Sequence, residues 1–261
     1  MEVHHHDFFE ICFLLGGEVR FRVEGKTLTL EPGDMLLINP RELHHAIISR
    51  DTLYERIVLW IDKNFLLELS GGGEDLSACF DTHLPTHSNR LRPTATQRVY
   101  LQGLLEKLVG EFYGSEPGSA LYARGLLTQF LVEVNRISAK TKEDSAQEKS
   151  LIDRVLRYIG EHYRENLTLE EIASAFYVSK YHLSHAFSHQ VGTSIYRYIQ
   201  FRRLMHAREL LEAGAMPGEV YPLCGFGDYT NFYRAFKNAY GCSPREFVRD
   251  NACRKSIAVI E

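Results

Sequence analysis

The chain has 261 residues, of which 44% are hydrophobic and 25% are charged, a composition typical of folded globular domains and not of disordered segments. Its length is enough for about two domains, each with a core of its own. No apolar run approaches the ~18 residues of a membrane-spanning helix, residues 1–4 lack the basic and apolar regions of a secretory signal, and the five cysteines form no CxxC pair. We therefore expect a cytoplasmic protein with reduced thiols and no membrane partner.

Charge is distributed unevenly along the chain. Residues 1–149 carry 16 Lys and Arg against 22 Asp and Glu, a net charge of −6, whereas residues 150–261 carry 14 against 12, a net charge of +2. A region of positive charge is the electrostatic signature of nucleic-acid binding. The excess is small, and on charge alone a near-neutral helical domain with scattered surface arginines fits equally well, so the assignment depends on the pattern of residues.

Residues 1–92 contain short β-rich runs separated by Gly and Pro turns. The runs are residues 11–15, 19–23, 27–30, 35–38 and 56–60. Their even spacing predicts a small antiparallel β-barrel or jelly roll. Because side chains alternate between the two faces of a strand, the inward positions include Cys12, Leu14, Phe21, Val23 and Trp60.

Two motifs in this region combine histidines with a glutamate. They are His4-x-His6-x3-Glu10-x6-Gly17, and Gly33-Asp34 followed by Pro40 and His44. The pattern resembles the two motifs of cupin domains, although the glycine that opens the first motif is absent. In metal-binding cupins, two histidines and a glutamate of the first motif and a histidine of the second hold one ion, a mixed set of nitrogen and oxygen ligands.

Three interpretations of this cluster stay open. The first is a divalent-metal cofactor site formed by His4, His6, Glu10 and His44. The second is the polar lining of an effector-binding site, for which the candidates are His4, His6, Glu10, Cys12, His44 and Trp60. In the third, the histidines are solvated, as in a frayed N-terminal tract or the remnant of a tag, and the barrel is purely structural.

Helical patterns follow the barrel. Residues 64–69 suit a short helix, and residues 93–137 contain two leucine-rich stripes at helical spacing that predict a pair of longer helices. Covering the barrel accounts for part of their apolar faces. Residues 138–149 are polar and lack aromatic side chains, which is typical of a linker, and residues 150–261 form a second, all-helical domain.

Within this second domain, residues 168–249 repeat one pattern. A shift of 49 residues aligns Leu183 with Phe232, Ala186 with Ala235, Phe187 with Phe236, Gly192 with Gly241 and Ser194 with Ser243. In each copy these apolar positions form a buried helical stripe, and a polar stripe faces away. The polar stripes are Tyr181, Ser184, His185 and Ser188 in the first copy and Thr230, Tyr233, Arg234 and Lys237 in the second.

Each copy has the signals of a helix-turn-helix. Thr168 and Glu171 form a capping box, and Ser179 caps the next helix. In the second copy residues 225–227 are the turn, and Asp228 is the cap. The helix predicted between the copies, residues 194–213, would be roughly 30 Å long, close to the ~34 Å between successive major grooves on one face of DNA.

The repeat also carries a recognisable signature. Its residues are Gly192-x-Ser194, Tyr198, Arg202-Arg203-Leu204, Ala207, Leu210-Leu211, Gly225-Phe226, Phe232, Arg234-x-Phe236-Lys237, Gly241-x-Ser243-Pro244 and Phe247. They resemble the signature of AraC/XylS-type transcription regulators. The resemblance implies a bacterial protein that binds double-stranded DNA with its third and sixth helices in adjacent major grooves. It also implies a homodimer formed by the leucine-rich helices and a barrel that binds a small effector, in relatives commonly a sugar.

By position in this signature, the residues that face DNA are Lys180, Tyr181, Ser184, His185, Tyr229, Thr230, Tyr233, Arg234 and Lys237. Lys180 and Lys237 resemble phosphate contacts. One departure concerns the second copy, where Pro222 falls inside the expected supporting helix and would cost ~3 kcal/mol in a helix interior. We expect that helix to be short or irregular.

The fold class expected is therefore α+β and multidomain, with a cupin-like barrel, two helices and a domain with two helix-turn-helix units. The favoured function is a transcription regulator that responds to an effector. The alternative is a metal-dependent cupin enzyme with an accessory helical domain. No nucleophile–base constellation, phosphate loop or pair of carboxylates is visible elsewhere, so we do not expect an enzyme.

Overall fold

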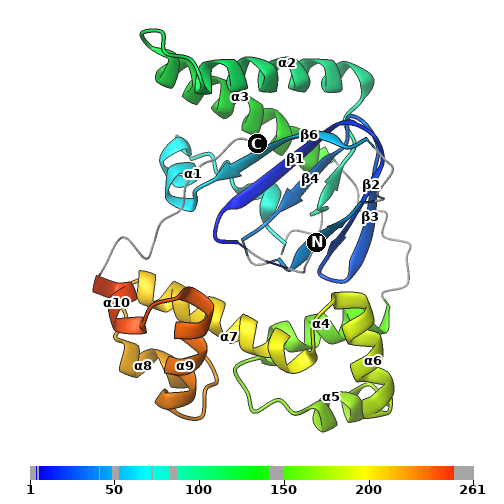
Figure 1. Cartoon of the computed structure of the whole chain (residues 1–261), viewed down its shortest axis with the longest axis vertical. Coiled ribbons are helices and arrows are strands. Elements are labelled where there is room, and N and C mark those ends of the chain that lie inside the picture. Colours follow the sequence, from blue (N-terminus) through cyan, green and yellow to red (C-terminus); the bar gives the residue numbers. More distant parts are fainter. Residues whose placement is uncertain are drawn as a thin grey trace. The chain divides into compact units, whose positions relative to one another are not determined.

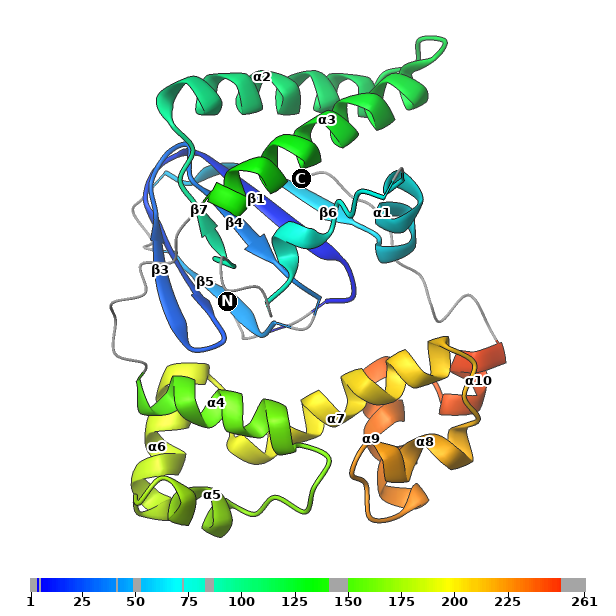
Figure 2. The same cartoon turned by 180° about the vertical axis from the view of Figure 1, so that it is seen from behind.

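The computed structural model describes residues 4, 6–40, 42–48, 53–71, 73–82, 87–140 and 150–249. The chain divides into two compact units, of which the first comprises residues 1–23 and 27–147 and the second comprises residues 148–255 together with the turn at residues 24–26. The first contains all the described strands, and the second is helical throughout its described part (Figures 1 and 2). The predicted α+β class, with a cupin-like β-domain followed by a helical domain, is confirmed.

The described strands of the first unit form two sheets. They are β1 (Phe9–Gly16), β2 (Val19–Val23), β3 (Lys26–Leu30), β4 (Met35–Ile38), β5 (His44–Ile47), β6 (Glu55–Ile61) and β7 (Arg90–Leu91). Their order is β6-β1-β4-β7 in one sheet and β3-β2-β5 in the other, so the predicted barrel is not closed. In the first sheet β1 lies antiparallel between its neighbours, and Glu10 is opposite both Ile38 and Trp60.

Two strands were not expected from the sequence. β5 begins at two consecutive histidines, which are not typical strand formers, yet pairing with β2 places His44 opposite Val23 and Ala46 opposite Phe21. β7 has only two residues, because it consists of a short pairing with β4 in which Leu91 is opposite Met35. Both strands depend on partners far away in the sequence and not on a local pattern.

The two faces of the β1 sheet pack into different cores. Ile11 and Phe13 belong to a core that includes Leu105 and Phe130, which lie on the helices α2 (Ala95–Phe112) and α3 (Ser119–Lys140). Alternate residues of β1 face the inner core, which is shared with the second sheet. The members of this inner core are Cys12, Leu14, Val19, Phe21, Val23, Leu30, Leu36, Ile38, Ala46 and Val58, with Leu28, Tyr54 and Trp60 at its edge. The five inward positions predicted from the sequence all lie here.

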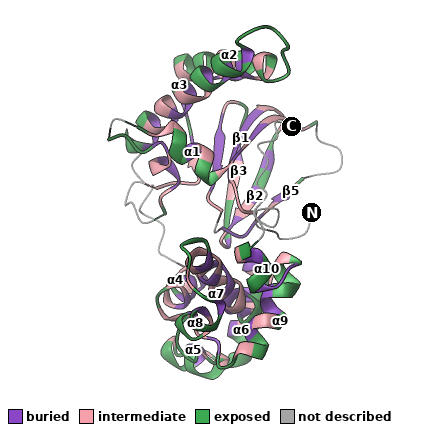
Figure 3. Cartoon of the chain, turned by 90° about the vertical axis from the view of Figure 1, so that its left-hand side faces the viewer, coloured by how far each residue is buried: buried purple, intermediate pink, exposed green. Residues whose placement is uncertain are grey.

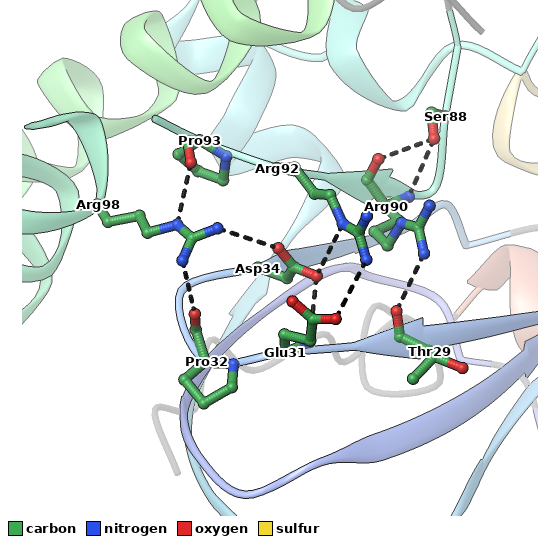
Figure 4. A network of polar contacts seen from close by, with 9 residues as sticks. All are labelled: Thr29, Glu31, Pro32, Asp34, Ser88, Arg90, Arg92, Pro93 and Arg98. Carbon is green, nitrogen blue, oxygen red and sulfur yellow. Dashed lines mark hydrogen bonds and ion pairs between the residues drawn. The ribbon is translucent and has the colours of Figure 1, made fainter. Parts of the chain in front are cut away.

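A network of charges fixes the turn between β3 and β4 (Figure 4). Asp34 is fully buried and lies 3.4 Å from Arg92 Nε and 3.8 Å from Arg98 Nη2. Its carboxylate also accepts a hydrogen bond from the backbone N–H of Glu31. Gly33 has φ of +91°, and a Cβ there would lie 2.5 Å from Arg98, so only glycine fits. The Gly33-Asp34 motif therefore anchors α2 to the sheet.

Two smaller helical segments follow β6. They are α1 (Lys63–Leu69), capped by Asp62, and a short 3-10 helix, Ala78–Phe80. At the other end of the unit, α3 runs to Lys140, whereas the predicted linker began at residue 138. The difference has a packing cause, since Ile137 and Ser138 are buried and the helix continues past them. Residues 141–149 of the predicted linker lie outside the described residues.

The second unit contains seven helices in its described part (Figure 2). They are α4 (Leu151–His162), α5 (Leu169–Ala175), α6 (Lys180–Val191), α7 (Ile195–Glu212), α8 (Pro217–Leu223), α9 (Tyr229–Tyr240) and α10 (Pro244–Arg249). Capping boxes at Ser150 and Thr168 begin α4 and α5, while Gly192 and Gly241 end α6 and α9 in the left-handed conformation. Across the described residues, no helix combines the length with the apolar character that crossing a bilayer requires.

Candidate functional site

The first helix-turn-helix consists of α5 and α6. Thr168 accepts a hydrogen bond from the N–H of Glu171, and the Glu171 side chain accepts one from the N–H of Thr168, which closes the predicted capping box. In the turn, Tyr177 has φ of +55° and its side chain is 97% exposed. A non-glycine residue in this conformation is strained, and sequence analysis did not identify it. Ser179 then caps α6 as predicted.

The exposed face of α6 is polar and aromatic. Leu183 and Phe187 are fully buried, so the residues between them face solvent. Tyr181 is 81% exposed, and its ring stacks on that of His185 with 6.2 Å between the centroids. Ser184 is half-buried beside them. Lys180, at the start of the helix, forms an ion pair with Glu170 of α5, and both side chains are largely exposed. These side chains can reach a partner without unfolding anything.

The second helix-turn-helix consists of α8 and α9. Helix α8 has seven residues, as many as α5, with Pro217 at its first position and Pro222 inside it. It is short, as expected, and Pro222 is its sixth residue, so only Leu223 follows the proline within the helix. Gly225 supplies the left-handed residue of the turn, and Asp228 caps α9 through the N–H of Asn231.

The outward face of α9 is more basic than that of α6. Thr230, Arg234 and Lys237 are exposed, and Tyr233 is half-buried. Tyr229 differs from the other predicted contacts, because its ring packs on Tyr221 and Phe232 and belongs to the edge of the second unit's core. Its position thus serves packing as well as any contact with a partner.

Helix α7 joins the two helix-turn-helix units into one body. Near its start, the Tyr198 ring packs against Phe187 of α6, with centroids 5.7 Å apart. Near its end, Ala207 and Leu211 share a core with Phe232 of α9. The helix has 18 residues and is therefore about 27 Å long. Figure 2 shows α6 and α9 at its two ends.

Residues 163–165 form a junction between the two helix-turn-helices. Arg203 of α7 donates one hydrogen bond to the carbonyl of Tyr163 and another to the carbonyl of Glu165, each 2.7 Å long. Between them, the carbonyl of Arg164 lies so close to Gly225 that a Cβ at residue 225 would be 2.6 Å from it. The turn of the second helix-turn-helix thus packs against the loop at residues 163–165, which precedes the first helix-turn-helix.

In the first unit, three of the four predicted metal ligands converge. One ligand atom from each of His6, Glu10 and His44 lies within 4.8 Å of the others. His6 Nε2 is 3.0 Å from Glu10 Oε2, and the Trp60 indole N–H donates to the same oxygen over 3.0 Å. His4 forms an isolated bridge with His44, with 4.5 Å between their rings, but its side chain is exposed.

Titration at this cluster follows from burial. Burial acts to raise the pKa of Glu10, but the hydrogen bond and charge of His6, together with the charge of His44 and the hydrogen bond from Trp60, outweigh it, so this pKa is lowered. Burial lowers the pKa of His44 to about 4, so its ring is neutral at neutral pH. His44 Nδ1 lies 3.0 Å from the carbonyl of Glu42, to which it donates, and its buried Nε2 has no hydrogen-bond partner among the described residues.

A divalent ion fits these residues. An unpartnered, buried imidazole nitrogen with a free lone pair is what a metal ligand requires, and a carboxylate with a second imidazole nearby completes a mixed N/O set suited to first-row transition metals. The second shell is also present, because the ring nitrogen of His44 that faces away from the cluster is oriented by Glu42.

The same inner face carries a second polar group that sequence analysis did not include. Arg56 Nη1 donates to the Tyr54 hydroxyl over 2.9 Å, and this hydroxyl lies 3.8 Å from Cys12 Sγ. Burial raises the pKa of the Cys12 thiol to about 11, so it is neutral. The strand period could have identified Arg56, since it stands two and four residues before the inward positions Val58 and Trp60.

Comparison with known proteins agrees with both units. Residues 1–131 match the family model of the AraC-like ligand binding domain, and residues 172–250 match that of a helix-turn-helix domain. The chain is 30% identical over 234 residues to an uncharacterized HTH-type transcriptional regulator of Bacillus subtilis, YbfI, covering 87% of this chain and 80% of the relative.

Two further similarities concern Salmonella arizonae and Geobacillus stearothermophilus. The chain is 27% identical over 245 residues to the HTH-type transcriptional activator RhaS of the first, covering 93% of this chain and 86% of RhaS. Among solved structures, the C-terminal domain of AraT, a response regulator of the second, is 28% identical with a TM-score of 0.38 over 43% of this chain and 91% of that domain. The ligand-binding family model matches half of the chain, the helix-turn-helix model matches a further part, and one relative is 30% identical. We conclude that the chain belongs to the AraC family of DNA-binding transcription regulators.

Proposed function

We propose that the protein recognises a DNA site in two blocks, one contacted by α6 and the other by α9. The observation that carries this proposal is the pair of outward polar faces at the two ends of a single helix, α7. A length of about 27 Å suits two readers in successive major grooves of one duplex. The protein thus acts by binding and not by catalysis.

The proposed contacts divide by chemistry. Tyr181, Ser184 and His185 read bases in the first block, and Thr230, Tyr233 and Arg234 read bases in the second. An arginine can donate two hydrogen bonds to one guanine, whereas hydroxyl and imidazole groups give more adaptable contacts. Lys180 and Lys237 contact phosphates, and Lys180 must leave Glu170 to do so. Tyr229, at the start of α9, is a further contact in the second block.

We also propose that an effector binds on the inner face of the first unit and alters DNA binding by a homodimer. Figure 3 shows exposed positions along α2 and α3. Apolar side chains among them support the dimer, since Val99 and Leu121 are each 76% exposed and Tyr100 and Tyr122 lie beside them in sequence. The polar residues on the inner face support the effector site. A sugar is one candidate class, and the cytoplasm is the proposed location.

Enrichment of random duplex DNA on the full-length protein at two salt concentrations tests the first proposal. We expect two conserved blocks about one helical turn (~10 bp) apart, with weaker recovery at higher salt because phosphate contacts release counterions. A single block would show that one of the two helix-turn-helices contacts only phosphates and reads no bases. No enrichment at either salt concentration, with or without the small-molecule panel described below, would contradict the proposal.

A second role for the first unit is binding of a divalent metal by His6, Glu10 and His44, with His4 as a further ligand. The buried Nε2 of His44 without a hydrogen-bond partner favours this role. A bound ion would supply a Lewis-acid centre that holds an oxygen of the effector. Metal content after dialysis against metal-free buffer tests it. We expect stoichiometric metal in the wild type and in the exposed-site control Glu18→Gln, and none in Glu10→Gln; metal-free wild type would contradict it.

A further inference from the structure

Arg56 is a cation in an unusual place. In β6 the side chains of Arg56, Val58 and Trp60 alternate with Ile57 and Leu59, which face the core beneath α2 and α3. Arg56 therefore points to the inner face, and its direct partner across the strands, Leu14, is completely buried there. The side chain is half-buried, so solvent still reaches it.

Its neighbours do not neutralise it. Among the described residues, no carboxylate lies within ion-pair distance of Arg56. Its guanidinium donates to the Tyr54 hydroxyl over 2.9 Å, and the guanidinium carbon lies 5.0 Å from the centroid of the Tyr54 ring. Burial raises the pKa of Tyr54, so its hydroxyl is neutral at neutral pH. The negative charge of Glu10 is already engaged by His6 and Trp60.

A guanidinium has five N–H donors, and a partly buried one is costly unless those donors and its charge are satisfied. Carboxylate and phosphate groups match its planar geometry with two parallel hydrogen bonds. Four residues further along the same face of β6, about 13 Å away along the strand, the half-buried Trp60 offers an aromatic surface, and the Phe8 ring lies 5.2 Å from the Trp60 ring. If its anionic group bound Arg56, an elongated molecule could extend along the strand toward these rings.

We propose that the effector of this regulator carries a carboxylate or phosphate group, and that Arg56 and Tyr54 bind this group on the inner face of the first unit. This inference rests on the proposed effector-dependent function. It narrows the effector from small molecules in general to organic anions, and it assigns to Arg56 the role of the residue that distinguishes an anion from its neutral analogue.

Matched pairs of probes test the inference on the full-length protein. Each pair shares a carbon skeleton and differs in one anionic group: D-glucose 6-phosphate and D-glucose, D-galacturonate and D-galactose, benzoate and benzyl alcohol, decanoate and decanol. A ligand that binds only the folded state raises the melting temperature. We expect the anionic member of at least one pair to raise it and the neutral member not to, and titration calorimetry then gives the dissociation constant.

Variants assign the effect to the site. Arg56→Gln should weaken that anion by at least about tenfold, because a charge-assisted pair is lost, and Tyr54→Phe by a few-fold. Arg20→Gln is the matched control, since Arg20 is exposed on β2, and it should leave the affinity unchanged. If Arg56→Gln does not fold, Tyr54→Phe alone carries the test.

Three outcomes would overturn the inference: no anion raises the melting temperature, neutral members bind as tightly as their anionic partners, or the Arg56 and Tyr54 variants bind like the wild type. DNA enrichment of Arg56→Gln is run in parallel and separates this from the proposed function. If Arg56→Gln recovers the same two blocks as the wild type, DNA recognition does not depend on the proposed anion site. If the wild type recovers no blocks, the proposed DNA-binding function is contradicted, but the measured anion binding still supports this inference.

Discussion

The first helix-turn-helix ends α5 with Tyr177 in the left-handed conformation, whereas the second ends α8 with Gly225 in the same conformation. The first supporting helix begins with a capping box, and the second begins at Met216, which gives no side-chain cap, and contains Pro222. Nevertheless both helices have seven residues, and α6 and α9 have twelve each. Two different local solutions thus produce supporting helices of equal length and outward-facing helices of equal length.

The chemistry of the two outward faces differs as well. On α6 the face consists of hydroxyl and imidazole groups with one lysine that is held by Glu170, and on α9 it contains Arg234 and Lys237 in the open. We therefore expect the second helix-turn-helix to contribute more of the affinity for DNA and a preference for guanine. The first should recognise its block through more adaptable contacts.

The largest effect should come from Gly225→Ala. A Cβ at this position would lie 2.6 Å from the backbone carbonyl of Arg164, and φ is +83°, so the turn must shift or the junction at residues 163–165 must open. We expect a loss of about 2–4 kcal/mol in the free energy of unfolding, measured by urea denaturation of the full-length protein. Gly227→Ala is the control, because nothing lies within 4 Å of a Cβ there; equal losses in both variants would remove the close approach as the cause.

Next in size is the contrast between Arg234→Ala and His185→Ala in DNA binding. Arg234→Ala should cost about 1–3 kcal/mol and relax the preference at one base pair, and His185→Ala should cost less in the other block. Lys237→Ala should instead weaken all sequences alike and lower the salt slope by about one. Affinities for the selected site and its single-base variants measure this; a uniform loss in Arg234→Ala would reassign Arg234 to phosphate.

A pair of cap variants should bring the two supporting helices closer in stability. Thr168→Ala removes the cap of α5 and should cost about 1 kcal/mol of unfolding free energy. Met216→Ser, three residues before Glu219, creates a capping box on α8 and should gain about 0.5–1 kcal/mol. Denaturation of both variants checks these values, and no gain from Met216→Ser would indicate that Glu219 cannot reach back to the new cap.

The smallest effect expected is that of Tyr177→Gly. The replacement relieves a left-handed conformation in a side chain that is almost fully exposed, and the greater freedom of glycine in the unfolded chain offsets part of the gain. We expect a net gain of up to about 1 kcal/mol, with Tyr196→Gly, a substitution in a helix, as a destabilising contrast. A loss of stability in Tyr177→Gly would show that the tyrosine ring makes a stabilising contact.

The helices of the C-terminal compact unit could be predicted from local sequence patterns. Caps such as Ser179 and Asp228, together with the period of Leu183 and Phe187, are properties of short stretches, and the structure places the helices where these signals indicated. The family resemblance added the fold of the whole domain. What could not be predicted was the junction at residues 163–165, because it depends on Arg203 and Gly225, which are distant in sequence.

The first unit was harder to predict for the same reason. The cluster of His6, Glu10 and His44 was predicted from motif spacing, yet β5, which positions His44, gave no strand signal of its own. Asp34 belongs to a cupin-like motif but serves as an anchor for α2, because the arginines that neutralise it lie about 60 residues further on, at Arg92 and Arg98. For Arg56, the strand period is enough to predict an inward side chain, but only the structure shows that no carboxylate among the described residues pairs with it.

The length of α7 fixes both the distance between α6 and α9 and the angle between their outward faces. Adding one residue to a helix lengthens it by only about 1.5 Å but turns everything beyond the addition by about 100° around the axis. Inserting or deleting one residue in α7 would therefore rotate the outward face of α9 by about 100° relative to that of α6, while the distance between the two helices would change by only about 1.5 Å. If α6 and α9 each read one block, as proposed, the spacing of the blocks can change without misaligning the two faces only by insertions in α7 that come close to whole helical turns.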